Sequence, residues 1–360
     1  MKISINSKIF TQQLLLWNKN ANTREMPWKG ETDPYKIWLS EVILQQTRVE
    51  QGTAYYHRFI EKFPTIKQLA IAREDEVFKM WEGLGYYTRC RNLLATARII
   101  AFEMDSIFPN EYASLLALKG IGPYTAAAIA SFAFNLPHAV VDGNVTRVIS
   151  RFFGLQTPID TTEGKKEYAN IAQGLLYKKS PCIYNQAMMD FGATICKPQT
   201  PLCQICPLQK KCITFLKELT KTLPVKSKKL TRRTRYFYYL IINFKDKIYV
   251  RKRTEKDIWQ SLWEFVLIEK EEKFTVNELI SDADFLSLFE EKGLQIRASP
   301  FYKQQLTHQT IEGVFLFVKA SAAIIDDRFT AVKKSDLKSL AFPRFITRFL
   351  ELKDDFKIFE

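Results

Sequence analysis

The chain has 360 residues, of which 46% are hydrophobic and 26% charged. This composition excludes a wholly disordered protein, and the length favours two domains. Lys and Arg outnumber Asp and Glu by 53 to 39, so the formal net charge is +14 and a polyanionic partner is expected. The longest run of small apolar residues, 125–134, is too short to span a bilayer, and residues 1–10 show no signal-peptide core. We therefore expect no membrane contact and a cytosolic location, or an organelle reached by a signal that the sequence does not reveal.

The first part of the chain has the periodicity of helices. In residues 65–81 the apolar positions recur at helical spacings, which predicts a helix over this range. Gly and Pro separate several similar segments that follow. We therefore expect a mainly α-helical domain over residues 1–215.

A glycine-containing turn follows within this helical part. Gly120 and Gly122 precede a helix of small residues, so the backbone can turn tightly there and expose amides that suit a phosphate. A simple corner between two helices is the alternative. Twenty residues beyond Gly122, Asp142 precedes another helical pattern, where by itself it is best interpreted as an N-cap.

Four of the six cysteines form one cluster in the sequence. Cys196, Cys203, Cys206 and Cys212 have the spacing C-x6-C-x2-C-x5-C, which can enclose one metal centre. Disulfides are not expected in a cytosolic chain. Zinc and a [4Fe–4S] cluster both accept four cysteines. The wide x6 and x5 gaps favour iron–sulfur, and the centre could serve only to hold the loop 196–212 together.

The net positive charge is concentrated after the cysteines. Residues 210–235 contain ten basic residues and one acidic residue, Glu218, and so carry +9 of the total +14. Pro224 and the weak periodicity predict an interdomain linker over 216–234. Solvation of the linker and contact with phosphates both explain this charge.

The composition changes beyond the linker. Runs rich in β-branched and aromatic residues predict strands at 236–244, 247–253 and 313–320. Helical patterns appear at 275–293 and 335–352. A smaller α+β domain is therefore expected after the helical one.

The ordered set of motifs resembles the helix-hairpin-helix DNA glycosylases that carry an iron–sulfur cluster, and within them the MutY-type adenine DNA glycosylases. The matching segments are 26–50, 81–93, 120–134 and 141–151, followed by the cysteine loop. The resemblance implies a catalytic helix-hairpin-helix domain over 1–215 with a [4Fe–4S] cluster on the four cysteines. It also implies base excision repair of adenine mispaired with 8-oxoguanine or guanine.

Glu41 and Asp142 are the expected catalytic pair. Adenine leaves from an oxocarbenium-like transition state, so the reaction needs an acid for the base and an anion near the sugar. On a helix Glu41 shares a face with Ile37 and Leu44, an apolar surrounding that raises a carboxyl pKa. Asp142 at a helix N-terminus receives amide hydrogen bonds, which favour its ionised form. Glu41 is thus expected to protonate adenine and later activate water, and Asp142 to stabilise the oxocarbenium ion or form a transient adduct with it.

Tyr124 distinguishes this chain within the superfamily. Bifunctional relatives such as endonuclease III carry at this hairpin position a lysine that forms a Schiff base with the sugar. With Tyr124 there, a monofunctional enzyme that leaves an abasic site is expected. The resemblance also places Tyr124 and Asn144 close to the sugar and Asp142.

Further contacts with the substrate follow from the resemblance. Gln46 and Tyr86 are expected to wedge beside the opposing 8-oxoguanine, with Gln45, Thr47 and Leu84 near that site. Since Gln46 and Thr47 follow Glu41 closely, we expect acid and wedge on one helix.

One position is expected to bind adenine, and another differs from the residue that is common in the family. Asp190 matches an acidic position that binds adenine in the family. Lys29 stands where many members have arginine, which weakens any bidentate contact there.

Residues 235–360 resemble the family's Nudix-like lesion-recognition domain. The glutamate string of Nudix hydrolases is missing, so pyrophosphate hydrolysis is not expected. In the lesion-sensing loop, which commonly reads Phe-Ser-His, this chain has Leu306, Thr307 and His308. Thr307 keeps the hydroxyl and His308 the imidazole, whereas Leu306 removes the aromatic ring.

The expected partner is double-stranded DNA with adenine opposite 8-oxoguanine or guanine, bound by a monomer. Whether a replication-clamp protein contacts the linker is left open. Two other functions also remain open: an endonuclease III-like bifunctional glycosylase and lyase, and a non-catalytic cluster-bearing DNA-binding scaffold.

Overall fold

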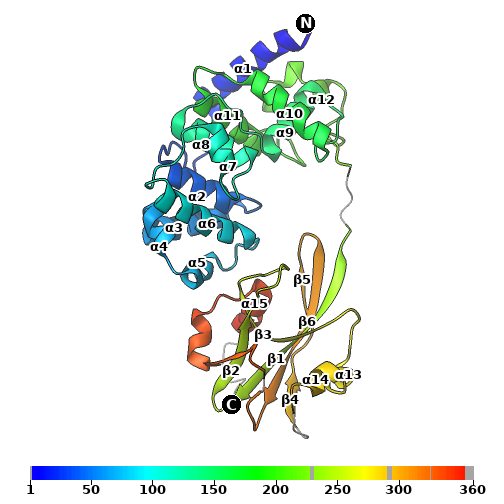
Figure 1. Cartoon of the computed structure of the whole chain (residues 1–360). Helices are drawn as coiled ribbons and strands as arrows, with labels where there is room; N and C mark the ends of the chain where they lie inside the picture. The colour runs from blue at the N-terminus through cyan, green and yellow to red at the C-terminus, as the bar shows by residue number, and fades with distance from the viewer. Residues whose placement is uncertain (1, 228–230, 290–293, 325, 353–360) are drawn as a thin grey trace. The chain divides into compact units, whose positions relative to one another are not determined.

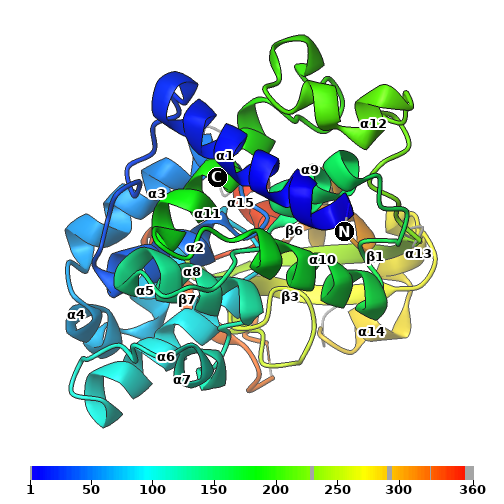
Figure 2. The same cartoon turned by 90° about the horizontal axis from the view of Figure 1, so that it is seen from above.

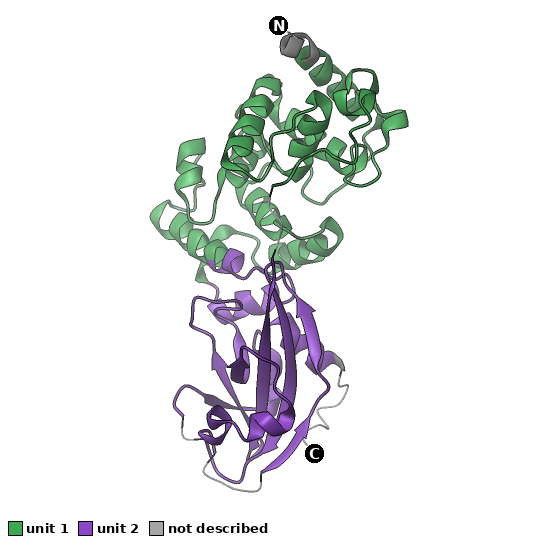
Figure 3. Ribbon diagram, turned by 90° about the vertical axis from the view of Figure 1, so that its right-hand side faces the viewer, with its two compact units in different colours: residues 1–71, 92–228 green, residues 72–91, 229–360 purple. Residues whose placement is uncertain are grey.

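The structure, a computed structural model, describes residues 2–227, 231–289, 294–324 and 326–352 (Figure 1). The chain divides into two compact units. Unit 1 comprises residues 1–71 and 92–228, and unit 2 comprises residues 72–91 and 229–360 (Figure 3). Two units were expected, but residues 72–91 were expected in the helical domain, and their contacts place them in unit 2.

Unit 1 is helical, as expected. Its α-helices are α1 (Lys2–Ala21), α2 (Pro34–Leu44), α3 (Val49–Lys62), α4 (Ile66–Ile71), most of α6 (Thr88–Glu103), α7 (Tyr112–Ala117), α8 (Pro123–Phe134), α9 (Gly143–Phe153), α10 (Thr162–Leu175), α11 (Pro181–Thr194) and α12 (Ile213–Leu216). The prediction of a single helix over 65–81 is wrong, because α4 ends at Ile71 and α5 (Glu74–Trp81) starts a separate helix in unit 2. None of the described helices is both long and apolar enough to cross a membrane.

One core of unit 1 joins the two ends of its sequence. α1 packs against α10 and α11 (Figure 2), and Phe10, Leu14 and Trp17 of α1 are buried there with residues of α9. The Trp17 and Phe191 rings meet edge-on at 5.1 Å. Burial of large side chains such as these stabilises a fold by about 2 kcal/mol each. This core fixes α9 and α11 side by side.

The small residues of α8 allow a close approach to α2. Ala126, Ala128 and Ala130 are fully buried, and α2 and α8 pack together. The preceding hairpin depends on Gly120, which has φ +78°, and a Cβ there would lie 2.6 Å from the Asn92 Cβ. Gly122 is the N-cap of α8 and leaves the first amides of that helix without a side-chain cap.

Unit 2 is built around a seven-stranded mixed sheet. Its strands are β1 (Arg233–Phe244), β2 (Lys247–Lys252), β3 (Trp263–Lys270), β4 (Gln295–Ala298), β5 (Tyr302–Gln305), β6 (Gln309–Lys319) and β7 (Thr330–Lys333). The order is β4-β6-β1-β3-β2-β7, and β5 pairs with β6. β1 and β6 are parallel, and the other pairings are antiparallel.

Helices cover both faces of this sheet. On one face α15 (Arg344–Leu352) packs its Phe349 ring on Phe315, with 3.8 Å between centroids. On the other face α13 (Val276–Ile280) and α14 (Ala283–Leu286) contribute buried apolar side chains. The helices predicted at 275–293 and 335–352 were too long. The described residues 275–289 hold the two short helices α13 and α14, residues 290–293 lie outside the described part, and Pro343 precedes the start of α15.

The first part of the predicted linker is not a free spacer. The Ile159 amide donates to the Val225 carbonyl, and Asp160 accepts from the amide and hydroxyl of Ser227. Residues 219–227 thus lie on unit 1, β1 begins at Arg233, and residues 228–230 fall outside the described part of the chain.

Candidate active site

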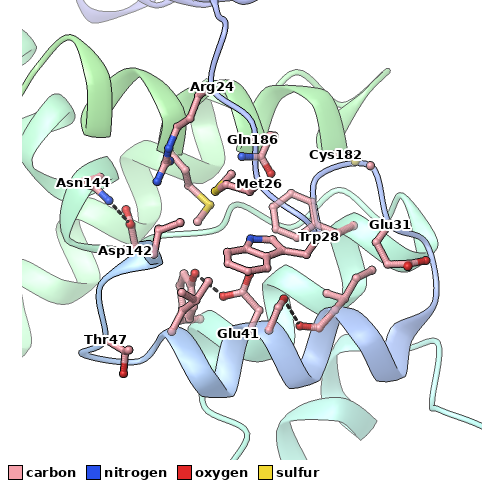
Figure 4. A pocket seen from close by; sticks show the side chains of 18 residues that line it. Arg24, Met26, Trp28, Glu31, Glu41, Thr47, Asp142, Asn144, Cys182 and Gln186 are labelled. Carbon is pink, nitrogen blue, oxygen red and sulfur yellow. Dashed lines mark hydrogen bonds between the residues drawn. The ribbon is translucent and has the colours of Figure 1, made fainter. Parts of the chain in front are cut away.

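A cavity of about 200 Å³ in unit 1 brings together the expected catalytic side chains (Figure 4). Glu41 comes from α2, Tyr124 from α8, and Asp142 and Asn144 from the start of α9. These residues are far apart in the sequence, and helix packing alone places them around one space.

Glu41 is buried and hydrogen-bonded to Tyr124. Its exposed fraction is 5%, and the Tyr124 hydroxyl donates to Glu41 Oε2 at 2.5 Å. Burial raises the pKa of Glu41 to about 7; the bond from Tyr124 lowers this pKa and the charge of Asp142 raises it. The apolar surrounding that the sequence predicted for Glu41 is therefore present, and this carboxyl is half protonated near neutral pH.

Asp142 is the N-cap of α9, as expected. Its Oδ1 accepts from the Val145 amide at 2.7 Å, and its Oδ2 accepts from Asn144 Nδ2 at 2.6 Å. The pKa of Asp142 is nevertheless raised, because burial outweighs these bonds and the attraction of Arg147. Hydrogen bonds to Asp142 were expected to keep it ionised; these bonds are present, and burial, which the sequence did not reveal, works against them. Asp142 is still the better anion, since more donors favour its charged form than favour that of Glu41.

A chain of hydrogen bonds leads from Asp142 to the cysteine loop. Asn144 Oδ1 accepts from Arg147 Nη2 at 2.8 Å, and Arg147 Nε donates to the Cys196 carbonyl at 2.8 Å. Gly192 of α11 lets α9 approach, because a Cβ there would lie 2.7 Å from the Asn144 Cβ. The orientation of Asp142 is thus coupled to the start of the loop 196–212.

The structure corrects the role of Asp190. Asp190 is fully buried and is not among the described residues that line the cavity. Its carboxylate accepts from Arg24 Nη1, Lys29 Nζ and Gln186 Nε2, each at 2.9 Å, and from Asn22 Nδ2 at 2.8 Å. With both oxygens occupied, Asp190 holds other side chains in place and leaves no room for a direct contact with a base.

Arg24 and Gln186 do line the cavity, together with Trp28 and Cys182 (Figure 4). Sequence reasoning missed these four residues as parts of the site. Trp28 could have been found from the sequence, because it lies in the segment 26–50 that matches the family. Arg24 and Gln186 were identified as site residues only from the structure, where both bind Asp190.

Gln46 and Thr47 lie beyond the helix that carries Glu41. α2 ends at Leu44, Gln45 is its C-cap, and Gln46 is exposed with φ +57°. The expectation of acid and wedge on one helix is therefore wrong, since a turn connects them. Left-handed backbone at a residue other than glycine costs about 1–2 kcal/mol and is typical of functional turns. Thr47 lines the cavity, and Gln45 Nε2 donates to Thr125 Oγ1 at 3.3 Å.

A second cavity, of about 510 Å³, lies within unit 2. It is lined by the turn 83–88, the loop 257–260, the hairpin residues 304–309 and the arginines Arg91 and Arg344. Arg91 Nη1 donates to the Gln260 carbonyl at 2.8 Å and so joins the turn to the loop.

The expected lesion-reading residues Leu84, Tyr86, Thr307 and His308 all line this second cavity. The Tyr86 hydroxyl and Thr307 Oγ1 are 2.5 Å apart. Tyr86 has φ +48° and 45% of its surface is exposed. Leu306 also lines the cavity, so the hairpin between β5 and β6 presents its whole tip there.

Buried arginines hold the loop and the hairpin of the second cavity. Arg235 of β1 donates to both oxygens of Asp257, at 2.9 and 2.7 Å, and to Gln309 Oε1 at 3.1 Å. Arg253 Nη2 also donates to Asp257, at 3.1 Å. Asp257 thus anchors the loop 257–260 to the sheet.

The four clustered cysteines line one further cavity, in unit 1, next to Arg151. Among the described residues, no three His, Cys, Asp or Glu side chains converge closely enough to hold a single metal ion. Four thiolates on one zinc at about 2.3 Å would bring their sulfur atoms within about 4 Å of each other. A [4Fe–4S] cluster likewise takes four cysteine ligands, one on each iron, so the four residues present fit such a centre.

Each of the two units matches a known protein family. Residues 39–173 match the HhH-GPD superfamily of base excision DNA repair proteins, and residues 237–352 match the NUDIX domain. Among solved structures, a thermostable thymine-DNA glycosylase has a TM-score of 0.55 at 28% identity, over 59% of this chain and 98% of that one. A non-covalent endonuclease III–DNA complex, with a TM-score of 0.50 at 22% identity over 59% of this chain and 96% of that one, shares the fold.

Curated relatives extend across both units. The adenine DNA glycosylase of Buchnera aphidicola subsp. Acyrthosiphon pisum (strain APS) is 35% identical over 265 residues, which cover 74% of this chain and 76% of the relative. That of Buchnera aphidicola subsp. Baizongia pistaciae (strain Bp) is 34% identical over 84% of both chains. The adenine DNA glycosylase of Homo sapiens is 39% identical over 56% of this chain and 39% of the relative. With this similarity and the site described above, the chain belongs to the adenine DNA glycosylase family.

Proposed function

We propose that the protein hydrolyses the N-glycosidic bond of adenine mispaired with 8-oxoguanine or guanine in duplex DNA, and leaves an abasic site in an uncut strand. The observation that carries this proposal is the buried cavity in which Glu41, Tyr124 and Asp142 meet. An acid with a pKa about 7 beside a better stabilised carboxylate suits the departure of a base from a sugar.

In the first step Glu41 donates its proton to a ring nitrogen of the flipped adenine. The C1′–N bond then breaks, its electron pair leaves with the neutral base, and positive charge develops on the sugar. Tyr124 bonds to only one Glu41 oxygen, Oε2, so the other oxygen is available to the base. The bond from Tyr124 also stabilises the carboxylate that remains.

Asp142 stabilises the oxocarbenium ion, either as an ion pair or through a transient adduct. The Val145 amide and Asn144 fix its two oxygens, so the carboxylate needs little reorganisation as charge develops. Glu41, now ionised, accepts a proton from water as the hydroxyl adds to C1′, which restores the acid.

Hydrolysis without strand cleavage follows from the absence of an amine. None of the described residues that line the cavity is a lysine. Lys29, which stands between the cavity residues Trp28 and Gly30 in the sequence, donates to Asp190 at 2.9 Å and to the Arg24 carbonyl at 2.6 Å. A Schiff base with the sugar therefore has no nucleophile, and β-elimination should be slow.

The second cavity is proposed to read the base opposite adenine. Tyr86 and Thr307 offer adjoining hydroxyls, His308 offers an imidazole, and Leu84 offers an apolar surface. 8-oxoguanine differs from guanine by an added carbonyl oxygen and a ring N–H, and these hydroxyls can serve as donors or acceptors to both. Leu306 supplies no aromatic face, so hydrogen bonding should dominate over stacking.

Duplex binding is proposed to combine the hairpin with the basic segment 210–235. The uncapped amides at the start of α8 suit one phosphate. The net charge of +9 in 210–235 supplies affinity that depends on salt and not on sequence. Specificity then resides in the two cavities.

We further assign a [4Fe–4S] cluster to Cys196, Cys203, Cys206 and Cys212, because all four line one cavity with a buried cation. The cluster would cross-link the loop 196–212 and offer one-electron redox chemistry. The loop in turn supports Asp142 through Arg147 and Asn144.

The decisive experiment is single-turnover cleavage of a duplex with adenine opposite 8-oxoguanine. Strand breaks are measured before and after hot alkali, with a thymine opposite 8-oxoguanine as the control duplex. Breaks that appear only after alkali support the proposal. Breaks without alkali would indicate a lyase of the endonuclease III type. Binding without any breaks, by protein that contains its cluster, would indicate a scaffold.

A further inference from the structure

Arg151 is a buried cation that contacts a sulfur atom of the cysteine cluster. It lies on α9, only 3% of it is exposed, and it faces the cavity that the four cysteines line. Its Nη1 donates to the Lys197 carbonyl at 2.6 Å and to Cys196 Sγ at 3.6 Å. These contacts hold the beginning of the loop 196–212.

The same guanidinium also reaches the far side of the loop. Nη2 donates to the Pro198 carbonyl at 2.7 Å and to the Thr220 carbonyl at 3.1 Å, and Nε donates to the Leu223 carbonyl at 2.9 Å. Arg151 thus ties the chain before the cluster loop to the chain that follows it.

No carboxylate balances this charge. In the described part of the chain, no ion pair involves Arg151, and its side chain donates to four carbonyls and one sulfur. The buried Arg235 and Arg253 are each paired with carboxylates, whereas Arg147, the other buried arginine of α9, donates to the Cys196, Gly143 and Gly192 carbonyls and to Asn144 Oδ1. A buried guanidinium without a counter-charge is strongly unfavourable, so an anion is expected close to it.

We infer that Arg151 is the positioning residue and counter-cation of the metal–sulfur centre held by the four cysteines. This inference rests on the proposed cluster. Four thiolates around a [4Fe–4S]²⁺ core give a net charge of −2, which Arg151 would partly neutralise. Its N–H···S bond to Cys196 would act on the same centre.

The inference predicts a change in reduction potential. When the cluster core goes from 2+ to 3+, one electron leaves and the net charge falls from −2 to −1. A nearby cation and a hydrogen bond to sulfur both stabilise the more negative state, so Arg151 should raise the potential. Without Arg151 the 2+ state should be easier to oxidise, and the cluster should be lost sooner.

The test compares Arg151→Met and Arg151→Lys with Lys210→Met in the purified full-length protein. Lys210 lies in the cluster loop but is exposed, so its loss removes the same charge from a solvated position. Iron and sulfide per chain, the visible absorbance of the cluster, its one-electron potential at an electrode and the rate of iron release to a chelator are measured. None of these readouts requires excision activity.

For Arg151→Met we expect a more negative potential and an iron release about 10–100-fold faster than in the wild type. Arg151→Lys should keep the potential nearer to that of the wild type, because it keeps the charge, but should release iron faster because it loses most of the carbonyl bonds. Lys210→Met should match the wild type in iron and sulfide content, absorbance, potential and iron release.

Equal potentials and release rates in Arg151→Met and Lys210→Met would overturn the inference. If Arg151→Met cannot be isolated with a full cluster, Arg151→Lys decides, and iron release at the wild-type rate then refutes the role. A wild-type protein with full activity but without iron and sulfide would instead refute the proposed cluster.

Discussion

Replacing Glu41 by glutamine should stabilise the protein and abolish most of its activity. Burial disfavours the ionised form of Glu41 and raises its pKa from 4.5 to about 7. Since the folded state holds this proton more tightly than the unfolded state, the carboxyl lowers the free energy of unfolding as the pH rises from 4.5 to 7. Glutamine accepts the bond from Tyr124 without carrying a charge, so the variant avoids this loss.

The size of the effect follows from the two pKa values. Below pH 4.5 both states are protonated and Glu41→Gln gains nothing from this source. The gain should be about 1 kcal/mol at pH 5, about 2 kcal/mol at pH 6 and about 3 kcal/mol at pH 8.5. Activity should fall about 10²–10⁴-fold in the same variant, because the proton donor to adenine is lost.

Urea unfolding, followed by far-UV circular dichroism and by the visible absorbance of the proposed cluster, measures the stability of both proteins between pH 5 and pH 8.5. Glu50→Gln is the matched control, since Glu50 lies exposed on α3 and its loss should change the free energy of unfolding by less than about 0.5 kcal/mol at every pH. A stability difference for Glu41→Gln that does not vary with pH would refute the reasoning. So would single-turnover excision at the wild-type rate.

Three further predictions test other parts of the site. Tyr124→Phe removes the bond that lowers the pKa of Glu41, so the alkaline limb of the pH–rate profile should move to higher pH, and an unchanged limb would contradict that contact. Asp257→Asn should lower the free energy of unfolding of unit 2 by about 2 kcal/mol, less than for a fully buried ion pair because Asp257 is 30% exposed. The same variant should show a smaller preference for 8-oxoguanine over guanine opposite adenine, measured as a ratio of excision rates. The double change Lys221→Gln and Lys226→Gln, at exposed positions of the basic segment, should reduce the slope of log affinity against log salt by about 2, and a fall in affinity with no change of slope would exclude phosphate contacts there.

Local sequence patterns predicted the parts of the site that depend on local geometry. Asp142 is the N-cap of α9 because its side chain needs only an amide three residues ahead. Glu41 shares a helical face with Ile37, and that face is buried. The hairpin required Gly120, which adopts a left-handed backbone.

Other predictions failed where long-range contacts decide. Asp190 meets Arg24 and Lys29 from a distant part of the chain, and these bonds fill its carboxylate. The hydrogen bonds expected at Asp142 are present, but burial also raises its pKa, and no neighbour in the sequence reveals that effect. The early part of the linker is held by Arg151 and by residues 159–160, so composition alone overstated its freedom.

By itself the sequence determined the two-part organisation, the helical and β-rich character of each part, the four cysteines and the types of side chain that excision of adenine needs. These properties follow from periodicity, turn chemistry and spacing along the chain. The tertiary structure alone decided that Glu41 and Tyr124 lie within hydrogen-bonding distance and that Asp190 binds residues that line the cavity. It also decided that Arg151 is buried and has no carboxylate partner among the described residues. The physical reason is that burial and pairing depend on which helices pack together, and the same local pattern is compatible with many packings.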